Sequence, residues 1–433
     1  MERYAVRNFS GVVRLSHNGE RKFSDWMGRA NEEFAVAMEK HSVFPVGSNS
    51  QLFTAVAMHQ LQERGRVNLS HAVSAYLDAA DFASFGFANQ TRWCPRLAAA
   101  GNVSALCENV TFVQLLTMSS GMEDRSFLYD KRLSHYRGSI AKHVGAFINA
   151  PLAFRPGANY SSSNANYVLL SYLIKKLSGQ KLETYFSEQI FQKIGLKLTY
   201  YDPYAGRRFV HRGSVSQYAN LYAQLGAPSD AEVAAAAEAN EEIETREYLA
   251  TDACAPDENS GALSGAGGIH STAKDMHRVY KDLFLHRGQQ SKVLSEQSIR
   301  TLLLTRNPVH SEYAQGIFVA IDEDTESQEW PSKISNCGRL KCAVTCMAMQ
   351  TLGADSVIAS AFTNHVEYTF PSRDAFAQWQ PSDESYSPPT DTTTSSSSNS
   401  TIRGFEVGDY DMADLSWALL DVFLGYFKAN ERS

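Results

Sequence analysis

The sequence lacks the long apolar runs of a membrane protein. In its 433 residues there is no stretch of about 18 or more uncharged apolar residues. The first ten residues, Met1 to Ser10, also lack the apolar core of a signal peptide and lead directly into a strand pattern. We therefore expect no membrane span and, for the chain as written, a cytosolic protein.

Basic clusters are missing as well. Lys and Arg number 40 against 47 Asp and Glu, a formal net charge of −7, and no basic cluster interleaved with aromatic residues occurs. Proteins that bind nucleic acid normally carry a basic face. The composition therefore predicts no nucleic-acid partner.

The six cysteines lack the spacing of a metal site. Cys337, Cys342 and Cys346 cluster, but with four and three intervening residues and no nearby histidine. We interpret them as buried structural thiols, with Cys342 and Cys346 on one face of a strand. The glycine turn at 265–268 lacks the Gly-Lys-Ser/Thr ending of a phosphate loop. We therefore expect no metal and no cofactor.

Two features favour the alternative of a secreted or organellar protein with an incomplete N-terminus. Cys94 and Cys107 lie close together in a loop and can form a disulfide in an oxidising compartment. Sequons of the form Asn-x-Ser/Thr, the acceptors of N-glycosylation, are also present. They begin at Asn8, Asn68, Asn89, Asn102, Asn109, Asn159 and Asn399.

The order of elements is typical of an α+β protein. Residues 11–30 show a strand hairpin around Asn18-Gly19, a dipeptide that favours a type I′ turn, and two further strands are predicted at 343–350 and 356–363. A helical middle separates them, so both ends of the chain must meet in one sheet. We expect a discontinuous sheet lobe, formed by 11–64 and 266–433, and a helical lobe over 65–265.

Apolar periodicity and caps place the helices. One follows Ser48 and ends at Gly65, one runs into Gly121, one spans 167–177, and one begins at Ser271 or Thr272. Three polar regions interrupt this framework and are predicted to be insertions, the second with an Ala/Glu-rich helix at 230–249 and the third mobile and rich in Ser and Thr. They cover residues 79–110, 203–260 and 366–408, and an amphipathic helix is expected at 412–427.

An ordered series of motifs carries a family resemblance. The chain resembles the serine β-lactamase and penicillin-binding protein superfamily, specifically its class C β-lactamase-like members, over nearly all of its length outside the insertions. The resemblance implies an antiparallel sheet flanked by helices, together with a helical lobe. The motifs are the opening hairpin, Phe44 to Ser48, 61–69, 115–121, Pro156-Gly157, 166–170, 194–196 and 267–272.

In that family a serine and a lysine one helical turn apart start the chemistry. The resemblance puts Ser48 in the place of the nucleophile and Gln51 in the place of the lysine. Residues at i and i+3 share a helix face, so a lysine there would touch the hydroxyl. An amide cannot take the serine proton, so the base is missing.

Two further family motifs are also altered. The Tyr-x-Asn motif corresponds to Ser162 and Asn164, so the tyrosine is replaced and the asparagine is kept. The His-x-Gly or Lys-Thr-Gly motif corresponds to Asn336 and Gly338, where the glycine would let a substrate backbone approach. The resemblance implies that these four residues converge with Ser48 and Gln51 in one pocket.

Each candidate also has a structural interpretation. Serine at a helix start is most often an N-cap, and we favour that role for Ser48 over nucleophilic attack. Glu123 and Asp124 are candidate substitute bases, although acidic residues after a glycine turn are usually solvated. Lys274 is expected to point away from the site.

Three classes of function follow from the sequence. The first is a catalytically impaired pseudoenzyme that binds a small molecule or peptide in the cleft, or a protein partner through its insertions. The second is a weak serine hydrolase acting on esters or amides through Ser48, and the third is a structural protein. We favour the first, and expect no detectable β-lactam or peptide turnover and at most slow esterase activity.

Overall fold

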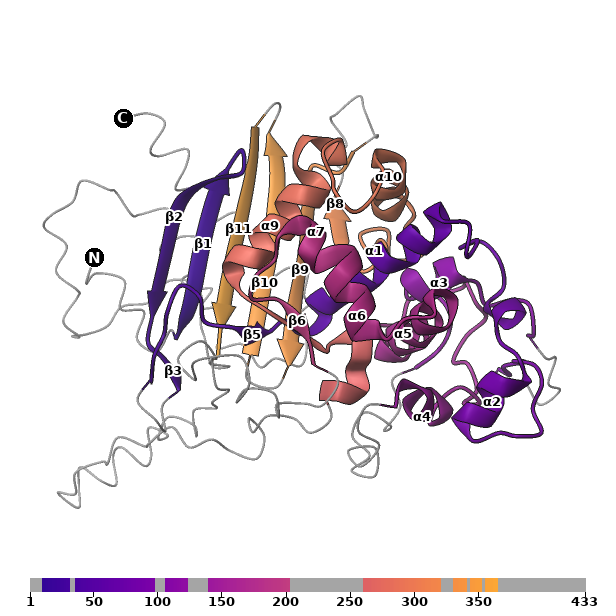
Figure 1. Ribbon diagram of the computed structural model, residues 1–433. Coiled ribbons are helices and arrows are strands. Elements are labelled where there is room, and N and C mark those ends of the chain that lie inside the picture. The colour runs from indigo at the N-terminus through magenta and orange to yellow at the C-terminus, as the bar shows by residue number, and fades with distance from the viewer. Residues whose placement is uncertain are drawn as a thin grey trace, which may run out of the picture.

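A six-stranded antiparallel sheet forms one side of the molecule (Figure 1). The structure is a computed structural model that describes residues 10–31, 36–97, 106–123, 139–202, 260–320, 330–340, 343–352 and 355–364. In sheet order the strands are β2 (Glu20–Met27), β1 (Gly11–His17), β11 (Asp355–Thr363), β10 (Ala343–Leu352), β9 (Lys333–Leu340) and β8 (Phe318–Ala320).

The two ends of the described chain meet in this sheet, as predicted. β1 pairs with β11, with Val12 opposite Phe362. The β1–β2 hairpin turns at Asn18 and Gly19, whose φ angles of 48° and 76° are both positive, as a type I′ turn requires. The mixed α+β class is therefore confirmed, whereas the lobe boundaries at 64 and 265 stay a prediction.

Two smaller sheets connect the large one to the helices. The strands β3 (Arg29–Asn31) and β4 (Val36–Ala37) form one of them. The other has the order β5 (Phe44–Pro45), β7 (Ile269–Ser271), β6 (Tyr200–Tyr201). Because β5 directly precedes the turn that holds Ser48, this second sheet fixes where that turn begins.

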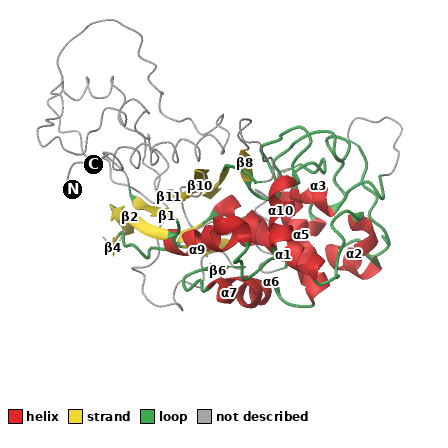
Figure 2. Cartoon of the chain, turned by 90° about the horizontal axis from the view of Figure 1, so that it is seen from above, coloured by secondary structure: helices red, strands yellow, loops and turns green. Residues whose placement is uncertain are grey.

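Helices cover one face of the sheet and extend away from it (Figure 2). α9 packs on β1, β10 and β11, and α1 packs against α5 and α10. The helices are α1 (Ser50–Glu63), α2 (Ala79–Phe85), α3 (Phe112–Leu116), α4 (Ile140–Gly145), α5 (Asn164–Ser178), α6 (Leu182–Phe186), α7 (Gln192–Ile194), α9 (Ala273–Phe284) and α10 (Glu296–Leu304). Short 3₁₀ segments cover Gly47–Asn49, Val73–Tyr76, Ser260–Ala266 and Leu285–Gly288, and a π-helical turn covers Ser187–Phe191.

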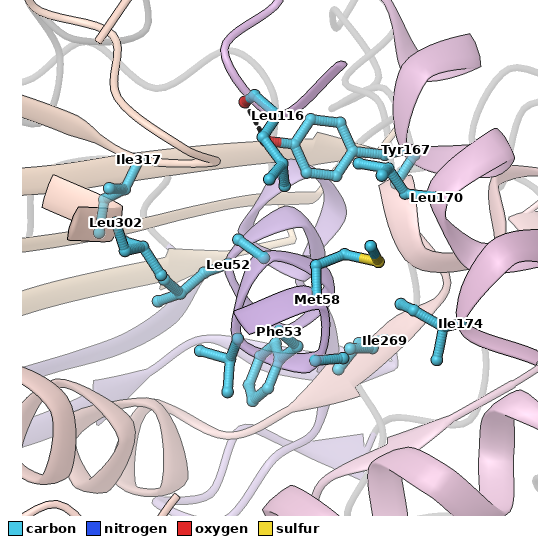
Figure 3. Packing of buried hydrophobic residues seen from close by; sticks show 14 of the residues in the cluster. Leu52, Phe53, Met58, Leu116, Tyr167, Leu170, Ile174, Ile269, Leu302 and Ile317 are labelled. Carbon is cyan, nitrogen blue, oxygen red and sulfur yellow. Dashed lines mark hydrogen bonds between the residues drawn. The ribbon is translucent and has the colours of Figure 1, made fainter. Parts of the chain in front are cut away.

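α1 is the central helix of the core. Every residue from Ser50 to Leu61 is buried, so the helix is enclosed on all sides rather than along one stripe. Leu52, Phe53 and Met58 lie among side chains from α5, β7 and α10 (Figure 3). A helix held this tightly positions the residues at its start with little freedom.

The capping signals in the sequence are confirmed. Thr272 caps α9 by accepting a hydrogen bond from the backbone N–H of Asp275, at 3.1 Å, and Gly179 ends α5 in a left-handed conformation. Thr111 and Gln114 form a capping box at the start of α3.

The prediction of an irregular loop over 79–110 is wrong in part, because α2 begins there. Asp78 and Asp81 form a capping box at the start of α2. Tyr172 donates to Asp81 Oδ1 at 2.6 Å, and Lys176 binds Asp78 Oδ2 at 2.7 Å. These contacts with α5 stabilise a short helix whose own sequence has weak periodicity, which is why the pattern missed it.

The interpretation of the clustered cysteines as thiols is also wrong. Cys337 on β9 lies opposite Cys346 on β10 and the two form a disulfide. Cys94 and Cys107 form a second one. The predicted pair, Cys342 and Cys346, belongs to one strand, whereas the disulfide forms across a hairpin whose register is set by the fold. Cys342 lies outside the described residues.

Several predictions fall on parts of the chain outside the described residues. These are the Ala/Glu-rich helix at 230–249, the Ser/Thr-rich insertion at 366–408 and the helix at 412–427. Among the helices that the structure does describe, none has the length and apolar character needed to cross a bilayer.

Candidate active site

Ser48 lies in the 3₁₀ turn Gly47–Asn49, which continues directly into α1. The residue at the N-cap of α1 is Asn49, and no side chain caps either segment. The interpretation of Ser48 as an N-cap is therefore wrong: Ser48 is the middle residue of the 3₁₀ turn, whose N-cap is Val46, and the N-cap of α1 is the next residue, Asn49.

The two residues after Ser48 have structural roles that Ser48 lacks. Asn49 Nδ2 donates to the carbonyl oxygen of Thr345 at 2.7 Å, and Ser50 Oγ accepts from the backbone N–H of Ile269 at 3.1 Å. Both residues are buried, whereas Ser48 is partly exposed. Within the described residues Ser48 Oγ makes no hydrogen bond, so its hydroxyl is available to a ligand.

β9 brings Asn336 and Gly338 against the Ser48 turn. Asn336 Nδ2 donates to the carbonyl oxygens of Ser48, at 3.2 Å, and Gly316, at 3.4 Å. A Cβ atom added at Gly338 would lie 1.8 Å from Val46 O and 2.9 Å from Ser48 N. Glycine is thus required here because the protein's own backbone, rather than the substrate backbone that the sequence suggested, occupies this space.

Gln51 is held by a tyrosine that the sequence analysis did not single out. Gln51 is 5% exposed, and Tyr313 Oη donates to its Oε1 at 3.0 Å. Tyr313 Oη also lies 3.4 Å from Tyr167 Oη, but Tyr167 donates its proton to Leu116 O at 2.7 Å (Figure 3). The Tyr313 proton is therefore left for Gln51, and the amide oxygen of Gln51 is an acceptor.

These tyrosines are neutral at physiological pH. Burial raises the pKa of Tyr167 well above its ordinary value, and burial also raises the pKa of Tyr313. Neither phenol can act as a base. Gly316 lies close to both residues: its φ of 78° is positive, and an added Cβ would lie 3.0 Å from the Gln51 backbone and from Tyr167 Oη. The glycine at this position is the feature of the sequence that could have indicated such a close approach.

The segment with Ser162 and Asn164 reaches the site through an aromatic contact. Ser162 is exposed, and Asn164 is the first residue of α5. Two residues before Ser162, the ring of Tyr160 lies 5.5 Å from that of Tyr313, the residue that holds Gln51. No hydrogen bond joins Ser162 to Ser48 among the described residues, so the link between the two is indirect.

The candidate substitute bases lie in other surroundings. Glu123 lies with Trp93 and Phe147 around a small cavity, and Asp124 is outside the described residues. Lys274 is in the first turn of α9, where burial, Arg278 and Arg14 lower its pKa. In the described part of the chain no Lys, His, Asp or Glu side chain hydrogen-bonds to Ser48 Oγ or to Gln51, and no group of three or more His, Cys, Asp or Glu residues could hold a metal ion.

The site thus has a serine in a glycine turn at the start of a buried helix, and the Asn-x-Gly segment of β9 faces it. A known family matches the part of the chain that contains Ser48 and α1. The sequence model of the Beta-lactamase family matches residues 3–323. The chain belongs to the Beta-lactamase family. The resemblance stated from the motifs is therefore confirmed.

Curated relatives of this family protein are bacterial. An N-acetylmuramyl-L-alanine amidase of Bacillus subtilis (strain 168) is 24% identical over 169 residues, which are 38% of this chain and 35% of the relative. An Escherichia coli (strain K12) protein that carries the name of a D-alanyl-D-alanine carboxypeptidase is 34% identical over 196 residues, 44% of this chain and 41% of the relative. The chain thus spans about two fifths of the curated relatives that it matches.

Solved structures share the fold. A penicillin-binding protein from Bacillus halodurans has a TM-score of 0.58 at 22% identity, over 85% of this chain and 94% of that one. A D-amino acid amidase from Ochrobactrum anthropi SV3 has a TM-score of 0.56 at 15% identity, over 83% and 89%. At these identities the likeness establishes the Beta-lactamase family fold and nothing about substrate.

Proposed function

We propose that this Beta-lactamase family protein is a catalytically impaired serine hydrolase homologue that acts by binding. The observation that carries the proposal is the state of Gln51. At the position where the family has its lysine, the chain has a buried amide whose oxygen accepts the Tyr313 proton. An amide has no pKa in the range that general-base catalysis needs.

The rate that a serine hydrolase loses without its general base supports binding over turnover. Removing a positioned general base typically lowers the rate by about 10²–10⁴-fold, and by more where the groups act as a unit. The tyrosine of the second motif is replaced by Ser162, and the cation or imidazole of the third by Asn336. Ser48, Asn164 and Gly338 remain, which favours a retained site for a small molecule or peptide.

A second candidate, a slow serine esterase, rests on Ser48 itself. Its hydroxyl has no structural hydrogen bond, although the next two residues are both used structurally. In this reaction Ser48 Oγ attacks the carbonyl carbon of an activated ester while its proton passes to water, and the C–O bond to the leaving group breaks, so that the alkoxide leaves and is protonated by solvent; a water molecule then attacks the acyl-Ser48 ester, releasing the carboxylic acid and the Ser48 hydroxyl. Backbone N–H groups at the start of α1 would stabilise the oxyanion.

Hydrolysis of 4-nitrophenyl acetate separates the two candidates. For the native chain we expect a rate within a few-fold of the Ser48→Ala variant. For Gln51→Lys we expect a gain of about tenfold or more, because a base then lies one turn from Ser48.

The matched control is the double variant Gln51→Lys, Ser48→Ala, which should lose that gain. Robust turnover by the native chain that disappears in Ser48→Ala would refute the impaired state and establish the esterase. A gain that survives in the double variant would mean that the lysine, and not Ser48, attacks the ester.

We also infer that the protein occupies an oxidising compartment, the alternative left open by the sequence. Two disulfides support this, because they persist mainly in secreted and organellar proteins. The sequon asparagines that the structure describes are all exposed, as glycosylation requires. They are Asn68, Asn89, Asn109 and Asn159.

Mass spectrometry of the protein from its own cells tests the compartment. After thiol alkylation without a reductant, Cys94, Cys107, Cys337 and Cys346 should stay unlabelled, and glycosidase treatment should lower the mass. Full labelling of these four cysteines together with an unchanged mass would restore the cytosolic assignment.

A further inference from the structure

A second pocket lies at the end of the sheet where β9 begins. It has a volume of about 390 Å³ and is lined by the β1–β2 turn, the segment after α9, Trp330 and the ends of β10 and β11 that face each other. Lys333 begins β9 and Gly338, beside Ser48, is five residues further on, roughly 17 Å at the rise of a strand. The pocket is therefore separate from the candidate active site.

Hydrogen-bond donors predominate among the described residues that line this pocket. His286, Arg287, Gln289 and Trp330 each carry a side-chain N–H group. Within the described residues none of these four side chains has a hydrogen bond or ion pair, and no Asp or Glu is part of the lining. In a chain with a net charge of −7, such a pocket selects negative groups.

The carboxylate of Asp355, which adjoins the lining in sequence, is engaged by other residues. Asp355 precedes the lining residue Ser356, and its Oδ1 accepts from Asn18 Nδ2 at 2.6 Å. The same oxygen lies 3.3 Å from His17 Nε2. Asp355 therefore has partners of its own, and among the described residues none forms an ion pair with the Arg287 guanidinium.

The backbone that presents these side chains is strained. His286 has φ 53° and ψ 33°, and Arg287 has φ 55° and ψ 30°, so two successive residues with a Cβ adopt the left-handed conformation. Glycine or asparagine would adopt it more easily. Strained residues of this kind concentrate at binding sites, where the position of the side chain outweighs the backbone cost.

The apolar residues of the lining determine which kind of group can carry the anion. Phe284, Leu285 and Trp330 contribute carbon surface next to the donors. A guanidinium pairs with carboxylate or phosphate through two parallel hydrogen bonds, and an indole face stacks on a flat ring. The volume is within the range of small-molecule sites.

We propose that this pocket, formed by His286, Arg287 and Trp330 at the far end of the sheet, is a second ligand site for a carboxylate or phosphate carried on an aromatic or apolar body. The site does not depend on the chemistry at Ser48. Ser48→Ala should therefore leave ligand binding here unchanged.

Calorimetric titration with four small probes tests the ligand class. Benzoate and phenyl phosphate should bind, benzyl alcohol should bind at least tenfold more weakly, and benzylamine should not bind. The ratio of the two anions then distinguishes a carboxylate site from a phosphate site. Failure of both anions to bind the native chain, or equal affinity for benzyl alcohol, would overturn the proposal.

Arg287→Asn tests the assigned residue without a folding defect. Asparagine tolerates the left-handed conformation, so the melting temperature should stay level or rise while the affinity for the anion falls at least tenfold. The matched control is Arg66→Asn, because Arg66 is exposed in the turn after α1. Unchanged affinity in Arg287→Asn, or an equal loss in Arg66→Asn, would contradict the assignment.

Discussion

The 3₁₀ turn at Ser48 and the 3₁₀ turn at Arg287 both contain left-handed backbone, but different residue types adopt it. Each contains a positive φ: Gly47, at 50°, occupies it in the first turn, and His286 and Arg287 occupy it in the second. Around Ser48 the neighbouring polar groups are paired with the protein, whereas around Arg287 the donors face a pocket. Hydrogen bonds from Asn49 and to Ser50 thus fix the position of the first turn. The second turn carries side-chain donors with no partner among the described residues, on backbone that is strained.

This contrast separates two ways of recognising a site. Ser48 is found through motifs, and in the function that we propose Gln51 stands in place of the proton-accepting lysine of those motifs. The pocket at Arg287 has no motif and is recognised from its volume, from backbone strain and from donors that have no partner among the described residues. A family motif therefore reports ancestry here, while local physical chemistry reports what each site can still bind.

The largest expected effect comes from the close backbone contact at the Ser48 turn. Gly338→Ala should lower the free energy of unfolding by about 3 kcal/mol or more, because its Cβ would lie 1.8 Å from Val46 O. Urea unfolding measures the change. The control is Gly65→Ala, where φ is also positive but no atom lies within 4 Å of the added Cβ, so only about 1 kcal/mol should be lost. Equal losses would mean that the Ser48 turn is not tightly packed on β9.

An intermediate effect concerns His277, on α9, which packs on the sheet that carries both regions. Burial lowers its pKa to about 3, and its ring nitrogens lie 3.1 Å from Ser16 Oγ and 2.9 Å from Ser360 Oγ. Below the ordinary histidine pKa the unfolded chain takes up a proton that the folded chain does not. Stability therefore falls as the pH drops from about 6.5 towards 3, by about 2 kcal/mol at pH 5.

His277→Gln isolates this contribution, since glutamine can bond to both serines but does not titrate. Unfolding free energies at pH 7 and pH 5 should then differ by about 2 kcal/mol less in the variant than in the native chain. An identical pH dependence in the two proteins would show that His277 is protonated in the folded state.

The smallest effects sharpen the comparison of the two turns directly. Gly47→Ala should lower the unfolding free energy by about 1–2 kcal/mol, because φ is positive and the added Cβ would lie 2.8 Å from Arg339 N. Arg287→Gly should raise it by about 1 kcal/mol, because glycine removes the strain. Thermal unfolding of both variants shows whether the unfolding free energy falls or rises in each. A loss of stability in Arg287→Gly would show that the left-handed backbone at Arg287 is not strained.

Local sequence patterns were enough to predict much of the framework. Asn18-Gly19 predicted the first hairpin, Thr272 the start of α9, and the apolar strands at the C-terminal side the closure of the sheet. These features depend on backbone preferences and periodicity within a few residues, which do not change with the fold around them. The expectation that Gln51 takes the place of the family lysine likewise comes from spacing alone, and it stays a prediction.

Contacts between distant parts of the chain could not be predicted from the sequence and come from the fold. It pairs Cys337 with Cys346, brings Tyr313 to Gln51 from 262 residues away, and puts Val46 in the space that Gly338 was expected to leave for a substrate. It also gathers the donors around Arg287 into a pocket. Such contacts depend on strand register and on packing between distant segments. Backbone preferences within a few residues could place the helices and strands, but no local pattern encodes which distant residues meet.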